Sequence, residues 1–151
     1  MSEHRPLDLE HFLPYRLSVL SNTVSRAIAD MYERRFALSI TEWRVMAVLG
    51  RYDGLSAREV AERTAMDKVA VSRALSKLID AGRVVRLVAD HDKRQSVLRL
   101  SDKGWKVYEQ IAPLALEHER RLLAHLDGEE REWLGRILDK LWSAELEELA
   151  R

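Results

Sequence analysis

The sequence predicts a mainly α-helical fold that contains one small β-hairpin, and three observations lead to this fold class. Apolar residues recur at steps of three and four over most of the chain, which is typical of amphipathic helices. Only three prolines and six glycines interrupt these patterns. The exception is residues 83–100, where β-branched residues and an apolar–polar alternation indicate two short strands.

Composition limits the class of protein further. The chain has 151 residues, of which 46% are hydrophobic, so it can bury a core as one compact subunit. It contains no cysteine, which excludes disulfide scaffolds, thiolate nucleophiles and cysteine-based zinc sites. No apolar run reaches the roughly 18 residues of a membrane span, and residues 1–12 are too polar for a signal peptide. We therefore expect a cytoplasmic protein.

The charges are distributed unevenly along a chain whose net charge is zero. Residues 67–106 carry ten basic and five acidic side chains, whereas residues 107–151 carry six and eleven. Such clustering is common on solvated surfaces, but a local cationic surface on a neutral body is also typical of a small nucleic-acid-binding protein.

The first long helix is predicted over residues 13–36, with Pro14 in its first turn. Its apolar side chains form one stripe, and their alternating steps of four and three are also typical of a seam with a partner helix. The stripe comprises Leu13, Leu17, Leu20, Val24, Ile28 and Met31.

Local capping signals predict the helices that follow. A helix over residues 41–52 precedes Ser56, which forms a capping-box pattern with Glu59 and begins a short helix that ends near Thr64. Asp67 caps the next helix, which runs from Lys68 to Ala81 and is closed by Gly82.

Two strands and two long helices complete the prediction. The strands cover residues 83–88 and 96–100 and are joined by the polar connection 89–95. Ser101 caps a helix over residues 102–125, and the capping pattern that starts at Asp127 begins the last one. The apolar side of that last helix comprises Trp133, Leu134, Ile137, Leu138, Leu141, Trp142 and Leu149.

The middle of the chain therefore reads as a helix-turn-helix followed by a β-hairpin wing. Helix 67–81 separates an apolar side, with Val71, Ala74, Leu75, Leu78 and Ile79, from a polar side, with Lys68, Ser72, Arg73, Ser76 and Lys77. A polar face of this kind fits the major groove of DNA, where arginine and serine reach base edges and lysine reaches phosphates. The alternative is an ordinary solvated face.

Three ordered segments resemble the MarR family of winged-helix transcription regulators. The first is Leu55-Ser-Ala-Arg-Glu-Val-Ala-Glu-Arg, and the second runs from Val71 through Leu78 to Gly82. The third contains Asp92-Lys-Arg94 and then Leu100-Ser-Asp-Lys-Gly104, the strongest marks of the resemblance. The match covers most of the chain, including the long flanking helices.

This resemblance implies a homodimeric regulator, usually a repressor, that binds pseudo-palindromic operators. Residues 1–38 and 105–151 would form the helical dimerisation region, and residues 39–104 the winged helix-turn-helix. Carried over by position, Arg94 is the wing arginine that enters a minor groove, and Asp92 orients it. The full set of expected DNA-binding residues is Ser56, Ala57, Lys68, Ser72, Arg73, Lys77, Asp92, Lys93 and Arg94.

The resemblance also implies an effector site between the dimer helices and the winged helix. Aromatic rings would cover an apolar ring there, and an arginine would pair with an anionic group. A small aromatic acid or an aromatic acyl-CoA is the expected class of effector. The candidate residues are His11, Tyr15, Arg16, Trp43 and Arg44.

Other classes of function fit the sequence less well. An enzyme is not expected, because His91 and Asp92 lie on a hairpin tip and no phosphate-cradling glycine loop or nucleophile elbow occurs. No metal or cofactor is expected either, because His118 and His125 are two helical turns, about 10 Å, apart.

A helical interaction or small-molecule-binding scaffold without sequence-specific DNA binding is the remaining alternative. The two long terminal helices and their tryptophans could serve such a module. We expect Trp43, Trp105, Trp133 and Trp142 to belong to the core rather than to contact a ligand.

Overall fold

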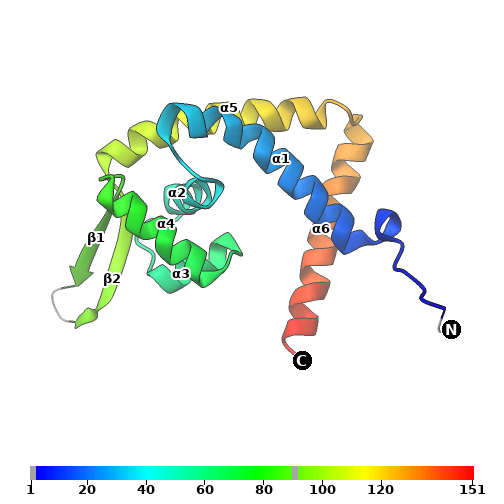
Figure 1. Ribbon diagram of the computed structural model, residues 1–151, viewed down its shortest axis with the longest axis horizontal. Coiled ribbons are helices and arrows are strands. Elements are labelled where there is room, and N and C mark those ends of the chain that lie inside the picture. Colours follow the sequence, from blue (N-terminus) through cyan, green and yellow to red (C-terminus); the bar gives the residue numbers. More distant parts are fainter. Residues whose placement is uncertain (1–2, 90–91) are drawn as a thin grey trace. The chain divides into compact units, whose positions relative to one another are not determined.

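A computed structural model describes residues 3–89 and 92–151, with the side chains of residues 89 and 92–95 outside the described part. The described chain is mainly helical with one hairpin, as predicted (Figure 1). Its elements in chain order are the 3-10 helix η1 (Leu9–His11), α1 (Leu13–Phe36), α2 (Ile40–Arg51), α3 (Ala57–Thr64), α4 (Lys68–Asp80), β1 (Val84–Ala89), β2 (Asp92–Leu100), α5 (Asp102–Leu123) and α6 (Gly128–Leu149).

The predicted caps begin the helices. Ser56 and Asp127 each form a complete capping box, in which the cap side chain accepts from the third helical N–H and the glutamate there accepts from the cap N–H. The Asp67 carboxylate accepts from Ala70 N–H, and the Ser101 hydroxyl accepts from Gly104 N–H. Local hydrogen bonds therefore set these boundaries.

The chain divides into two compact units, Met1–Ala112 and Pro113–Arg151. The division falls inside α5 at Pro113, which has no backbone N–H to donate to the helix. The core of the first unit joins α2, α3, α4 and the hairpin, and its most buried side chains include Val45, Met46, Val60, Leu78 and Leu98.

The strands pair antiparallel, with Val84 opposite Leu100 and Leu87 opposite Val97. The predicted polar connection over residues 89–95 is wrong in extent, because β2 begins at Asp92 rather than at Ser96. A wing that projects from the core needs no apolar face along its length, so polar residues can continue its backbone ladder. The apolar–polar alternation starts only at Ser96, so the prediction began the second strand too late.

A cluster of hydrogen bonds joins the wing to the helices around it. Arg83 lies just before β1, and its Nη2 donates to the carbonyl of Phe36, the last residue of α1, at 2.8 Å. Its own carbonyl accepts from Ser101 N–H at 3.0 Å. A Cβ on Gly104 would lie 2.0 Å from that carbonyl oxygen, so only glycine fits at this position in the first turn of α5.

The second unit contains the end of α5 and all of α6. Every α6 residue is exposed, including the large apolar side chains that form its predicted apolar side. Trp133 and Trp142 are 53% and 67% exposed, and Trp105 of the first unit is 38% exposed. We expected these three tryptophans to belong to the core. In a single chain that prediction is wrong, because all three are exposed. Among the described residues, no helix is long and apolar enough to cross a membrane.

Candidate nucleic-acid interface

The N-terminus of α3 presents the first part of the interface. Ser56 and Glu59 satisfy each other's backbone N–H groups, at 3.1 and 3.2 Å, and thereby fix where the helix begins. The N–H groups of Ala57 and Arg58 have no acceptor within the helix, and the helix dipole adds positive potential at this end. A hollow of about 700 Å³ opens here, lined by Gly54, Ser56, Ala57, Arg58, Glu59, Ser96 and Val97.

Helix α4 supplies the second part of the interface. Its inner side is anchored in the core by Val71, Ala74, Leu75 and Leu78, and Ile79 is half-buried. The opposite side places five polar residues in solvent, as the periodicity predicted: Lys68, Ser72, Arg73, Ser76 and Lys77. A second hollow, of about 300 Å³, lies between α3 and α4 and is lined by Ala57, Arg58, Ala61, Lys68, Val71, Ser72 and Leu75.

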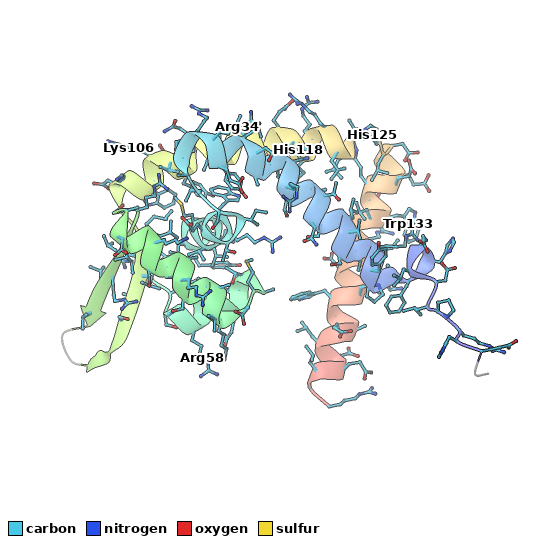
Figure 2. The ribbon with its side chains drawn as sticks, in the orientation of Figure 1. Arg34, Arg58, Lys106, His118, His125 and Trp133 are labelled. Atoms are coloured by element: carbon cyan, nitrogen blue, oxygen red, sulfur yellow. The ribbon has the colours of Figure 1, made fainter. Side chains whose placement is uncertain are left out.

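The charges on this surface differ in whether they are paired. Arg58, which points away from α3 in Figure 2, pairs with Glu62 at 3.1 Å. Lys68, Arg73 and Lys77 form no ion pair with a carboxylate in the described part of the chain. These three cations of α4 are therefore available to an external anion.

The wing residues are placed only in part. Asp92, Lys93 and Arg94 belong to the backbone of β2, but their side chains lie outside the described residues. The expected insertion of Arg94 into a minor groove and its orientation by Asp92 stay predictions. His91, which was weighed for an enzyme site, also lies outside the described residues.

The five candidate effector residues fall into two separate groups. His11 is exposed and bonds Asp8 through Nδ1 at 2.8 Å, and the exposed Tyr15 and Arg16 follow in the first turn of α1. Arg44 instead donates from Nη2 to the Ser25 hydroxyl at 3.2 Å. Ser25 is ten residues, about 15 Å of helix, beyond Tyr15. One chain therefore does not bring these residues into a single site.

Trp43 belongs to an aromatic cluster. Its ring lies 6.1 Å from that of Tyr32 in α1 and 5.7 Å from that of Tyr108 in α5, centroid to centroid. Burial raises the pKa of Tyr32 to about 12, so its hydroxyl stays neutral at physiological pH. Two roles were predicted for Trp43, in the core and in the effector site. The structure shows that it packs against the core.

Sequence reasoning missed Tyr32 and Tyr108 as partners of Trp43. One signal was present, because a glycine inside a helical pattern often marks a close approach. A Cβ on Gly50 would lie 2.5 Å from the Tyr108 ring, so this glycine lets α5 pack against α2. Among the described residues, no group of three or more histidine, aspartate and glutamate side chains could hold a metal ion.

A helix-turn-helix that is followed by a two-stranded wing, with a cationic second helix, defines the class of winged-helix DNA-binding proteins. The model of the MarR family matches residues 38–95, which cover this motif. Over this motif the chain is similar to the MarR family of transcriptional regulators, whose members are DNA-binding proteins and not enzymes.

One relative is the HTH-type transcriptional regulator BilQ of Clostridium symbiosum, which is 33% identical over 93 residues. That alignment covers 62% of this chain and 65%, just under two thirds, of BilQ.

Solved structures extend the similarity to nearly the whole chain. A MarR/EmrR family regulator from Acinetobacter sp. ADP1 is 26% identical, with a TM-score of 0.83 over 91% of this chain and 97% of that one. A MarR family regulator from Streptomyces coelicolor, solved in complex with DNA, is 22% identical, with a TM-score of 0.76 over 95% and 92%. At that identity it supports the fold alone.

Proposed function

We propose that the chain is a homodimeric, cytoplasmic transcriptional regulator that binds a pseudo-palindromic operator in a sequence-specific manner. One observation carries this proposal above the others. The polar side of α4 is exposed and holds three cations without described carboxylate partners, while its apolar side is buried in the core. A rigid cationic helix of this kind fits a major groove about 12 Å wide.

The exposed apolar surfaces of the terminal helices support the proposed dimer. Large apolar side chains of α1 and α6 remain exposed in one chain, including Leu17, Leu20, Leu138 and Leu141. A second copy can cover them by two-fold symmetry without any other partner. We therefore keep residues 1–38 and 105–151 as the dimerisation region and residues 39–104 as the DNA-binding region.

Within the DNA-binding region, each residue has a proposed role. Ser72 and Arg73 read base edges, and Lys68 and Lys77 contact phosphates. Ser56 and Ala57 place the positive end of α3 against a phosphate. In the wing, Lys93 adds a phosphate contact and Arg94 enters a narrow minor groove, where the negative potential is strongest.

We also propose that the protein represses transcription and that an effector releases it from the operator. A relative from Mycobacterium tuberculosis, 28% identical over 133 residues, is named a transcriptional repressor. The regulator PcaV of Streptomyces coelicolor, 21% identical, was solved with its natural ligand. For this chain we propose a small aromatic acid or aromatic acyl-CoA. Because the five candidate residues lie in two groups, the second subunit would have to help complete the site.

Selection from a random DNA pool tests the function. The protein should enrich a palindrome whose half-sites lie about 10 base pairs apart, one helical turn. On the selected duplex, Arg73→Ala should weaken binding by about 1–3 kcal/mol, and on random DNA by less. Lys77→Ala serves as the matched control, because the loss of a phosphate contact should weaken binding to both duplexes alike. Failure to enrich any sequence would contradict the proposal and favour the interaction scaffold.

A further inference from the structure

An exposed tyrosine next to the helix-turn-helix is flanked by two arginines that no predicted role uses. Tyr52 directly follows α2 and is 37% exposed. The guanidinium carbon of Arg63, near the end of α3, lies 3.9 Å from its ring centroid. The guanidinium carbon of Arg51, the last residue of α2, lies 5.1 Å from the same centroid. Both arginines are exposed.

The neighbouring carboxylates do not neutralise these two arginines, because each carboxylate already has another partner. Asp53 pairs with Arg99 at 3.1 Å, and Glu62 pairs with Arg58 at 3.1 Å. Glu59 accepts from Ser56 N–H in the capping box. Arg51 and Arg63 form no ion pair among the described residues. Their guanidinium carbons lie at most 9.0 Å apart, because they are 5.1 and 3.9 Å from the same ring centroid.

The ring holds the two cations but leaves their charge in place. A cation over a tyrosine face is attracted by the negative face of the ring, and the contact restricts the rotamers of a long side chain. Both side chains are exposed, so their N–H donors stay open to an anion. Phosphates and carboxylates are the groups that match such forks, in a bidentate geometry.

The position of Arg63 on α3 points to the source of that anion. Ala57, Arg58 and Ala61 face the hollow beside α4. Arg63 follows Arg58 by five residues and Ala61 by two, so at 100° per residue it lies on the side of α3 turned away from α4. In a docked helix-turn-helix the first helix crosses the DNA backbone while the second enters the major groove. In such a complex the side of α3 that is turned away from α4 would face the DNA backbone outside that groove.

We propose that Arg51, Tyr52 and Arg63 form a flanking phosphate clamp, which binds the DNA backbone outside the half-site read by α4. This inference rests on the proposed operator binding and extends its footprint. The clamp reads no base, so it adds affinity and salt dependence without adding specificity.

A series of duplex lengths tests the clamp. The wild-type protein and the double variant Arg51→Gln/Arg63→Gln are titrated with the selected operator, once with ten flanking base pairs on each side and once cut at the outer edge of each half-site. On the long duplex the variant should bind at least severalfold more weakly. Its slope of log affinity against log salt should also be shallower by about 0.9 for each lost phosphate contact. On the short duplex both proteins should bind equally.

Two matched variants separate the clamp from general effects of charge and folding. Arg35 is also exposed and lies 5.4 Å from the ring of Phe36, but it sits at the end of α1. Arg35→Gln should therefore leave binding to both duplexes unchanged. Tyr52→Phe keeps the aromatic face and should bind like the wild type, whereas Tyr52→Leu should lose part of the flank-dependent affinity.

The possible outcomes decide between the proposals. If the wild-type protein binds the operator and the double variant binds both lengths equally well, the clamp is wrong and the proposed function stands. An equal loss on long and short duplexes also overturns the clamp, because the arginines then act inside the half-site or on the fold. If the wild-type protein binds no operator, the proposed function fails, and the clamp fails with it.

Discussion

Residues 38–111 and helix α6 contain similar amphipathic patterns, but only the first region buries an apolar core within one chain. Leu78 of α4 and Leu98 of β2 are fully buried, and Val45 and Val60 are as well. In α6, by contrast, Ile137, Leu138 and Leu141 remain 42–49% exposed.

The difference shows that an apolar stripe predicts that a helix face will be covered, but not by which chain. The helices of the DNA-binding region are short and joined by tight turns, so each finds its neighbours nearby in the sequence. The apolar surface of α6 extends from Trp133 to Leu149, more than half of the helix circumference at 100° per residue. We infer that a second copy covers it.

The largest predicted effect is the loss of a core side chain from the self-sufficient region. Leu78→Ala removes a fully buried side chain that joins α4 to the core. The cavity should lower the free energy of unfolding by about 2–5 kcal/mol. Denaturant titration at fixed protein concentration measures this change. Leu116→Ala, at a position 64% exposed, is the control and should cost far less unless Leu116 lies in the dimer interface.

The second prediction concerns the exposed stripe of α6. Leu141→Glu places a charge near the middle of the apolar surface and should weaken dimerisation at least tenfold, about 1.4 kcal/mol. Ser143→Glu is the matched control, because Ser143 lies on the opposite side of the same helix. Sedimentation at several concentrations measures both dissociation constants. If the two variants dissociate alike, this stripe is not the interface.

The smallest effect should occur where α1 meets the DNA-binding region. Arg83→Met removes the hydrogen bond to the Phe36 carbonyl, but it also removes a buried Nε that has no described partner. Because these changes oppose each other, the net loss of stability should be only about 1 kcal/mol. Arg86→Met, at an exposed position of β1, is the control. A loss above about 3 kcal/mol would show that this joint holds the two regions together more strongly than its contacts suggest.

Most helices could be predicted because their signals are local. Ser56, Asp67, Ser101 and Asp127 each cap a helix through backbone groups within three residues, so the sequence pattern alone identifies the boundary. The extent of β2 could not be predicted in the same way. Asp92 pairs with Ala89 through the backbone, beyond an irregularity in the register at Val88 and Ala89, and no side-chain pattern reveals such a pair.

The candidate interface was predictable to a similar degree. The periodicity of α4 separates Leu75 and Leu78 from Arg73 and Lys77, and the burial agrees with it. The contacts of the Tyr52 ring with two arginines depend on how α2 and α3 approach each other, and the hydrogen bond from Arg83 joins residues 47 positions apart. The separation of the effector candidates was hidden for the same reason.

The native mass of the protein, free and bound to the selected operator, tests the central claim most directly. The chain mass is 17.5 kDa. Sedimentation at micromolar concentration should give a free species of twice that mass and a complex with two chains on one duplex, both half-sites being required. A free species of 17.5 kDa that binds a single half-site as tightly as the full palindrome would contradict the account.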